Sequence, residues 1–171
     1  MKNTYIASLI IKYKTGNLLV DTNLLILYLV GRFNPQRISS FKRTQSYTLE
    51  DFLALKSLVS HFNSILTTPN ILTEVSNLSF KLNEQFQFQL FPSFHKLIAS
   101  LNEEYVNSIA ASEQESFNRF GLTDSIIVEL AKRDCLILTD DFPLFGYLQS
   151  HRIDAINFNH IRSERWLFDP I

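Results

Sequence analysis

The sequence predicts an α/β fold with a mainly parallel central sheet flanked by helices. Short, continuous apolar runs of the kind that is buried on both faces of a parallel sheet recur at 18–20 and 135–138, and 65–67 is expected to form a further strand. Segments with helical spacing of apolar residues lie between these runs, and this alternation is typical of a parallel sheet. With 171 residues, 46% of them apolar, the chain can build the core of one domain, and we expect a single domain over 1–171.

In the first half of the chain, each expected element is marked by its apolar spacing or by the residues at its ends. Apolar residues at i, i+4 spacing predict the first helix, which Gly16 ends, and Pro35 with several small polar residues interrupts any period after the second helix. Thr48 and Asp51 resemble a weak capping box, and Pro69 suits the first turn of a helix. In order, we expect helix 4–14, strand 18–20, helix 24–30, loop 31–47, helix 48–62, strand 65–67 and helix 69–78.

The second half begins with a mixed signal and then becomes regular. Phe86, Phe88 and Leu90 alternate with glutamines in the manner of a strand, whereas the following residues keep a clearer helical period. Thr123 is expected to cap the next helix, with Asp124 in its first turn. The expected elements are a strand-like segment at 86–90, helix 94–101, helix 123–133, strand 135–138, helix 142–150 and strand 153–158.

Composition excludes several classes of protein. The four glycines lie too far apart for a glycine-rich phosphate loop, a dinucleotide fingerprint or a nucleophile elbow. The longest uncharged apolar run, 24–30, is far shorter than the roughly 20 residues that cross a bilayer, and the apolar stretch 5–11 is followed by no cleavage-like site. A lone Cys135 cannot form an intramolecular disulfide. We expect a cytoplasmic protein that neither spans nor binds a membrane.

Two acids directly follow buried apolar strands. Asp21 comes after 18–20, and Asp141 comes shortly after 135–138, while Glu74 and Asp124 lie on helices that could reach the same edge. In open α/β sheets, ligands bind outside the carboxyl ends of the strands, where the strand order reverses. Two carboxylates about 4 Å apart repel by roughly 4 kcal/mol at an effective dielectric constant of 20, so a cluster of them needs a cation. Oxygen ligands without Cys or His favour Mg²⁺ or Mn²⁺.

Four segments of the chain are similar, in order and spacing, to the PIN-domain nucleases. They are LLVDTNLLI with Asp21, PNILTEVSNL with Glu74, GLTDSIIVELA with Asp124 and LILTDDFPL with Asp141. The resemblance spans 18–158, and the helix at 4–14 and the loop at 31–47 depart from compact members of the family. It implies a three-layer PIN-like domain with a metal site of three or four acids that cuts RNA.

The resemblance also implies roles for individual residues. Carried over position by position, it implies catalytic acids at Asp21, Glu74, Asp124 and Asp141, metal ligands at Asp21, Asp124, Asp141 and Asp140, and orienting side chains at Asn23 and Thr139. Asp140 and Asp141 stay open as alternatives for the fourth acid, because Asp140 fills a position that the family leaves variable. One or two Mg²⁺ or Mn²⁺ ions would activate a water for in-line attack on phosphorus, leaving a 5′-phosphate and a 3′-hydroxyl. Glu74 fits a partner through bound water, or a proton acceptor, better than an obligatory ligand.

A basic segment lies in the expected loop. Residues 24–49 contain no Asp or Glu. The candidate RNA-binding residues of this segment are Arg32, Arg37, Lys42 and Arg43, and they are interleaved with Phe33, Phe41 and Tyr47. Cations can follow a phosphate backbone and aromatic rings can stack on unpaired bases, as single-stranded RNA binding requires. The alternative is a surface loop that serves solubility alone.

Three functions compete. The first is a metal-dependent endoribonuclease acting on RNA; as the toxin of a toxin–antitoxin pair, it would have an antitoxin protein and a second copy of the chain as candidate partners. The second is a catalytically inert module of the same fold that binds RNA or protein, its acids being ordinary turn and helix-start residues. The third is a phosphatase with an aspartyl nucleophile, which fits poorly because that chemistry wants a second Asp where Asn23 stands.

Overall fold

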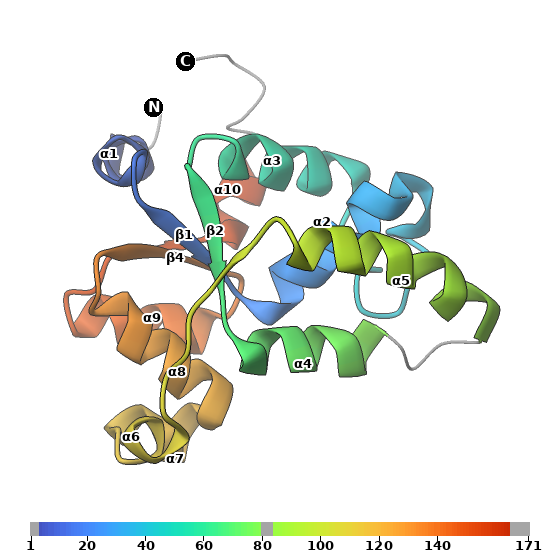
Figure 1. The fold of residues 1–171 in the computed structure, drawn as a ribbon. Helices are drawn as coiled ribbons and strands as arrows, with labels where there is room; N and C mark the ends of the chain where they lie inside the picture. Colours follow the sequence, from blue (N-terminus) through green and yellow to red (C-terminus); the bar gives the residue numbers. More distant parts are fainter. Residues whose placement is uncertain (1–3, 80–83, 165–171) are drawn as a thin grey trace.

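The computed structural model describes residues 4–79 and 84–164 and has a parallel sheet with helices on both of its faces (Figure 1). The strands of this sheet are β1 (Asn17–Val20), β2 (Ser64–Thr67), β3 (Asn102–Glu103), β4 (Cys135–Thr139) and β5 (Ala155–Asn157). The helices are α1 (Thr4–Tyr13), α2 (Thr22–Phe33), η1 (Pro35–Arg37), α3 (Leu49–Val59), α4 (Pro69–Ser79), α5 (Glu84–Ile98), α6 (Ser108–Ser112), α7 (Glu115–Phe120), α8 (Leu122–Ala131), α9 (Phe142–Ser150) and α10 (Phe158–Glu164). The predicted fold class is confirmed.

The order of the strands creates a switch point in the middle of the sheet. The five strands are ordered β3-β2-β1-β4-β5, and every neighbouring pair is parallel. The chain moves outward from β1 through β2 to β3, and then crosses to the other side of β1 to add β4 and β5. The order therefore reverses between β1 and β4, where Val20 is paired with Leu138. This is the position at which parallel α/β sheets bind ligands, outside the carboxyl ends of the strands.

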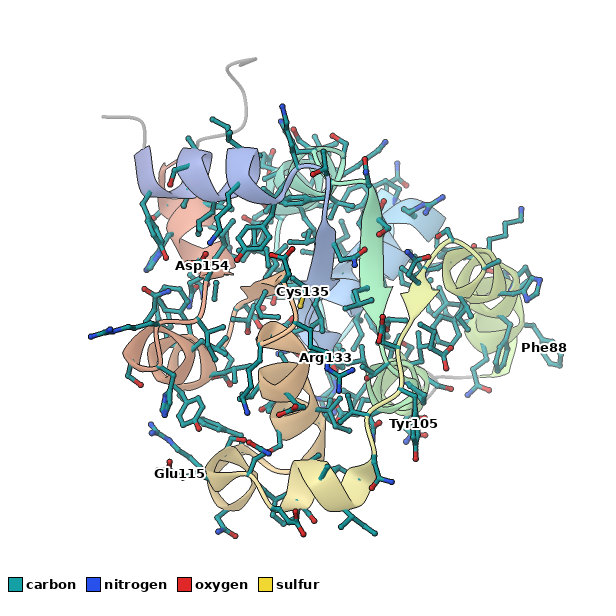
Figure 2. The ribbon with its side chains drawn as sticks, turned by 60° about the vertical axis from the view of Figure 1, so that its left-hand side comes forward. Phe88, Tyr105, Glu115, Arg133, Cys135 and Asp154 are labelled. Atoms are coloured by element: carbon teal, nitrogen blue, oxygen red, sulfur yellow. The ribbon has the colours of Figure 1, made fainter. Side chains whose placement is uncertain are left out.

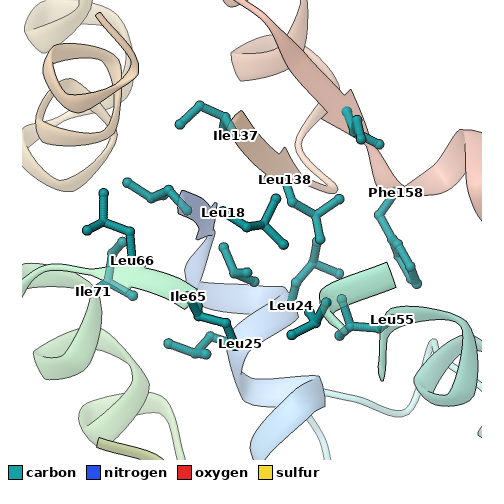
Figure 3. Packing of buried hydrophobic residues seen from close by; sticks show 14 of the residues in the cluster. Leu18, Leu24, Leu25, Leu55, Ile65, Leu66, Ile71, Ile137, Leu138 and Phe158 are labelled. Carbon is teal, nitrogen blue, oxygen red and sulfur yellow. The ribbon is translucent and has the colours of Figure 1, made fainter. Parts of the chain in front are cut away.

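The core is built around β1 and the helix that follows it. Leu18 of β1, Leu138 of β4 and Leu24 of α2 are fully buried and pack in one cluster (Figure 3). Burying a leucine side chain stabilises the fold by about 1.5–3 kcal/mol. The helix α2 is buried nearly all round because α3, α4 and α5 pack against it, and its buried residues are Leu24, Leu25, Ile26, Leu27, Leu29, Val30 and Gly31. A helix that is apolar on every side is suited to such a central place.

The prediction of a strand at 86–90 is wrong, because these residues belong to α5. Phe86 and Leu90 are four residues apart, a spacing that puts them on one face of a helix as well as on one face of a strand. Leu90 is buried, whereas Phe88 between them is 76% exposed and projects away from the protein (Figure 2). A strand would have placed all three on the same face. The apparent alternation is therefore part of the i, i+4 spacing of an amphipathic helix.

Several boundaries also differ from the expectation. The segment 31–47 is not all loop, because α2 continues to Phe33 and the side chain of Asn34 accepts a hydrogen bond of 3.0 Å from the Gln36 N–H to begin η1. The last strand ends at Asn157, and α10 follows it directly. The sequence did not predict β3, α6, α7 or α10. None of the helices within 4–79 and 84–164 has the length and apolar character needed to cross a membrane.

The close packing of α2 on α3 depends on Gly31. A Cβ atom built on Gly31 would lie 2.2 Å from Cδ2 of the buried Phe52 ring. We expect Gly31→Ala to lower the free energy of unfolding by about 1–3 kcal/mol, because overpacking outweighs the better helix propensity of alanine. The control is Gly146→Ala in α9, where an added Cβ meets nothing within 4 Å. Urea unfolding should show that this second variant is as stable as the unsubstituted protein or more so, and equal losses in both variants would contradict the packing argument.

Candidate active site

Three of the acids predicted from the sequence lie at the switch point of the sheet. Asp21 directly follows β1, and Asp140 and Asp141 follow β4. The Asp21 N–H donates to the Leu138 carbonyl at 3.0 Å, so the ladder between the two central strands continues up to the acid itself. The carboxyl ends of parallel strands share one edge, and these acids are thus fixed to that edge by the sheet.

Asp21 is held by three protein donors. Its Oδ1 accepts from the Leu24 N–H at 3.0 Å and thereby caps α2, and its Oδ2 accepts from Thr139 Oγ1 at 2.5 Å and from the Asp140 N–H at 3.0 Å. Asp21 is only 6% exposed, and its burial raises the pKa of the carboxyl, an effect to which the charge of Asp140 adds. A carboxylate has about four acceptor positions, so one position on Oδ1 remains for another partner.

Glu74 joins three helices. Its Oε2 accepts from Thr22 Oγ1 at 2.8 Å, and its Oε1 accepts from Thr123 Oγ1 at 2.5 Å, so one carboxylate on α4 is tied to the starts of α2 and α8. The expectation that Thr123 caps α8 is wrong: Gly121 precedes the helix with a φ of +83°, and no side chain bonds the helix end. The hydroxyl of Thr123 donates to Glu74 instead. Because its partner lies 49 residues away, no local pattern could reveal this role.

Asp124 is half-buried in the first turn of α8 and lies near two other carboxylates. Burial raises the pKa of Asp124 to about 6, with further contributions from the charges of Asp141 and Glu74. Its side chain makes no hydrogen bond to any residue that the structure describes. Asp141 is exposed; its Oδ1 accepts from the Leu144 N–H at 2.7 Å and caps α9. The side chains of Glu74, Asp124 and Asp141 therefore form the acidic group of the site.

Asp140 belongs to a different set of contacts. Its Oδ2 accepts from the phenol of Tyr47, its Oδ1 accepts from Asn23 Nδ2 at 3.3 Å, and its carbonyl accepts from Asn159 Nδ2 at 2.8 Å. The two neighbouring acids thus have different surroundings: Asp140 is held against Tyr47, and Asp141 lies beside Asp124. Asn23 orients Asp140, whereas Thr139 orients Asp21 and also accepts from the Asp141 N–H at 3.0 Å.

Tyr47 belongs to the site, but its role differs from the predicted stacking on RNA bases. It is 5% exposed and Phe41 is 4% exposed, so these rings cannot stack on bases as expected. Phe33 is half-buried and packs edge-on against Phe86 with the ring centres 5.6 Å apart. Burial and the hydrogen bond to Asp140 raise the pKa of Tyr47. The phenol is therefore a neutral donor that fixes Asp140.

A cation from α10 covers the Tyr47 ring. The guanidinium of Arg162 lies 5.0 Å from the ring centre, donates from Nε to Asp51 Oδ1 at 3.1 Å, and donates from Nη2 to the Ser46 carbonyl at 2.8 Å. Asp51 in turn closes the capping box of α3 with Thr48, which confirms the predicted box. The end of the chain segment 31–47 is thus fastened to the site through Tyr47.

We expect Tyr47→Phe to lower the free energy of unfolding by about 1–3 kcal/mol, because the phenol is buried and its loss leaves an oxygen of the half-buried Asp140 without its donor. The matched control is Tyr13→Phe, which also removes a tyrosine–aspartate hydrogen bond, to the partly exposed Asp154, at 3.0 Å. Its loss should stay within about 1 kcal/mol. Chemical denaturation of both variants measures the difference. Equal losses of stability in the two variants would show that the hydrogen bond to Asp140 contributes no more than the one to Asp154.

The candidate RNA-binding cations lie at the end of α2 and in the segment that follows it. Arg32, Arg37, Lys42 and Arg43 are all exposed. Arg32 lies 5.5 Å from the centre of the Tyr28 ring, and Arg37 lies 5.6 Å from that of Phe86. Along α2, Arg32 lies roughly 16 Å from Asp21, whereas Lys42 and Arg43 come shortly before Tyr47, which contacts the site. A bound strand that contacts both Arg32 and Asp21 would therefore span several nucleotides.

The carboxylate oxygens of the acidic group are of the kind that a hard divalent cation prefers, but the side chains are too far apart to share one ion in the structure. Within the described residues, no three His, Cys, Asp or Glu side chains are close enough together to hold a metal ion without moving. The ion pairs of the same residues involve Asp154, Glu129, Glu104 and Asp51, and none involves an acid of the site. Within 4–79 and 84–164, the carboxylates of the acidic group therefore have no ion-pair partner. Oxygen donors under mutual repulsion fit Mg²⁺ or Mn²⁺.

Comparison with known proteins assigns no family to the chain. No protein-family model, no curated protein and no solved structure matches it. The functional conclusion therefore depends on the geometry and chemistry of the site.

Proposed function

We propose that this chain is a metal-dependent endoribonuclease of the PIN-domain type that uses Mg²⁺ or Mn²⁺. The observation that carries the proposal is that the half-buried Asp124 lies near Glu74 and Asp141, and that none of the three forms an ion pair with a described residue. Burial and neighbouring charge raise the pKa of Asp124 to about 6, which marks a group that gains from a nearby cation. Such perturbed groups cluster at functional sites.

Each residue of the site has a role in this proposal. Asp124, Asp141 and the free position on Asp21 Oδ1 would supply ligand oxygens, with Thr139 and Asn23 orienting the acids of the central strands. When bound, the ion supplies activation of a water and stabilisation of the leaving oxygen of the phosphodiester. Glu74, which accepts from two hydroxyl donors, would accept a proton from an incoming water. The products would carry a 5′-phosphate and a 3′-hydroxyl.

The exposed basic segment supports RNA as the substrate. Arg32, Arg37, Lys42 and Arg43 present unpaired charge to solvent along the end of α2 and the following loop. In the described part of the chain, none of the four forms an ion pair with an acid. Cations that are free in this way can neutralise phosphates of a strand whose cleavage point lies at the acids.

The test is cleavage of a labelled single-stranded RNA in the presence of Mn²⁺. The unsubstituted protein should cut, and EDTA should stop it. Asp124→Asn should reduce the rate by about 100-fold or more, because a ligand oxygen is lost. The matched control is Asp134→Asn, an equal change of charge on an exposed residue before β4, where asparagine tolerates the φ of +58°. Equal rates for the unsubstituted protein and Asp124→Asn would overturn the proposal.

A second candidate is an inert module of the same fold, which one observation favours. Asp21 and Asp141 both serve as helix caps, and the described acids do not close around an ion as they stand. Calorimetric titration with Mn²⁺ separates the two functions. Binding that is lost in Asp124→Asn supports the nuclease, and the absence of binding in the unsubstituted protein supports the inert module.

The toxin role is the biological setting that we propose for such a nuclease. Induced expression of the unsubstituted protein should arrest growth, and expression of Asp124→Asn should not. Sequencing the RNA ends formed shortly after induction would report the cut sites and the chemistry of the ends together. Growth arrest by both proteins would separate toxicity from cleavage and contradict this setting.

A further inference from the structure

A small, shallow cavity that is largely open to solvent lies next to the acids. It has a volume of about 240 Å³ and is lined by Pro69, Asn70, Thr73, Glu74 and Thr123. The first four belong to α4 and the last to α8, whose first turn reaches α4 here. The hydrogen bond from Thr123 to Glu74 joins the two walls at 2.5 Å. Asp124 is the next residue, so the cavity adjoins the acidic group.

Three of the lining residues lie on one face of α4. Asn70, Thr73 and Glu74 are separated by three and four residues, which places them on one face of the helix. Glu74 is directed to the site by its two hydroxyl donors, and this fixes the rotation of the face that carries Asn70 and Thr73. Neither the Asn70 amide nor the Thr73 hydroxyl is engaged with any part of the chain that the structure describes. Both groups are available to a ligand.

The chemistry of the cavity selects against phosphate and in favour of a neutral ring. Its five lining residues include a carboxylate and no Lys or Arg, so an anionic group is repelled. The Asn70 amide offers a donor and an acceptor side by side, and Pro69 offers an apolar surface. The volume lies below the roughly 300–1,000 Å³ of pockets for drug-sized ligands, so a single ring system fits better than a larger molecule.

We infer that this cavity binds one nucleobase of single-stranded RNA, that of a nucleotide flanking the cleaved bond, and that Asn70 reads its edge. The inference rests on the proposed function for the position of the cleaved bond. Proteins read single-stranded RNA by taking up splayed bases and hydrogen-bonding their edges. An asparagine amide makes two parallel hydrogen bonds with adenine, so adenine is the expected base. Asn70 is then a specificity-determining residue of the site.

The first experiment maps the cut sites in a randomised single-stranded RNA pool. The unsubstituted protein should prefer adenine at one fixed position beside the cut by about tenfold. Asn70→Ala should lose that preference while still cutting with Mn²⁺. Asn118→Ala, at an exposed asparagine of α7, is the matched control and should keep it. A preference that survives in Asn70→Ala, or no preference in the unsubstituted protein, would overturn the inference.

A second experiment separates this inference from the proposed function. Proteins carrying Asp124→Asn, with and without Asn70→Ala, are titrated with labelled adenine and cytosine pentaribonucleotides, and binding is followed by fluorescence anisotropy. Asn70→Ala should abolish an adenine preference of about tenfold. Absence of cleavage in the unsubstituted protein together with adenine-selective binding would reject the nuclease and keep the base-binding cavity. Cleavage with binding that is blind to the base would reject the cavity and keep the nuclease.

Discussion

Asp124→Asn should raise the free energy of unfolding of the metal-free protein at pH 7.5 by about 1–3 kcal/mol. Burial and the charges of Asp141 and Glu74 raise the pKa of Asp124 from its ordinary 3.8 to about 6. Between these two values the folded state binds more protons than the unfolded state, so this group's contribution to stability falls as the pH rises from about 4 to 6. Above pH 6 the full cost of a charged Asp124 is present, and neutral asparagine removes it.

The pH dependence identifies the cause of this gain. The advantage of Asp124→Asn should nearly disappear near pH 4, where Asp124 is protonated in the folded state and is close to its ordinary pKa of 3.8 in the unfolded state. Urea unfolding at pH 4 and pH 7.5 measures it, with Asp134→Asn as the control for a change of net charge. A gain that is equal at both pH values, or a loss of stability at pH 7.5, would contradict the stated cause.

Mn²⁺ should reverse the order of stability of the unsubstituted protein and Asp124→Asn. An ion that binds the folded state stabilises it by mass action, by about 2.7 kcal/mol when its concentration is 100 times the dissociation constant. The unsubstituted protein should therefore show a rise in Tm with Mn²⁺ that Asp124→Asn lacks. A variant that is more stable without the ion and less active with it is the usual trade between stability and function at an active site.

Thr139→Val should lower the free energy of unfolding by about 2–4 kcal/mol, although the two side chains have nearly the same shape. Thr139 is fully buried, and its hydroxyl donates to Asp21 Oδ2 at 2.5 Å and accepts from the Asp141 N–H at 3.0 Å. Valine leaves a buried carboxylate oxygen and a backbone donor without this partner, and such groups carry a large desolvation cost.

Thr139→Ser is the matched control, because it keeps the hydroxyl and removes only a methyl group. Its loss should stay near about 1 kcal/mol. Urea unfolding of both variants at pH 7.5 gives the comparison. If serine and valine proved equally destabilising, the methyl group and not the hydroxyl would account for the role of Thr139.

The sequence was informative wherever a local pattern has one structural meaning. The runs around Leu18 and Leu136 predict strands because residues buried on both faces of a parallel sheet are continuously apolar. The two residues of β3, Asn102 and Glu103, are exposed at the edge of the sheet and carry no such signal. At 86–90 the even spacing fits a helix and a strand equally, and only packing decides between them.

In the site, too, local patterns located some residues and missed others. Asp21 and Asp141 could be placed from the sequence because each closely follows a strand, and their neighbourhood at the sheet edge follows from parallel pairing. The hydroxyl of Thr123 and the phenol of Tyr47 could not, because their partners lie 49 and 93 residues away. The different surroundings of Asp140 and Asp141 are likewise a tertiary property, since adjacent side chains differ only in direction.

Three helices begin at the edge of the sheet that carries the acids. Asp21 caps α2, Asp141 caps α9, and Asp124 lies in the first turn of α8. The aligned peptide dipoles of each helix place roughly half a positive charge at its start, and an adjacent anion gains about 0.3–1 kcal/mol from it. The backbone itself therefore offsets part of the repulsion among the carboxylates. We therefore expect the chain to fold without a bound ion.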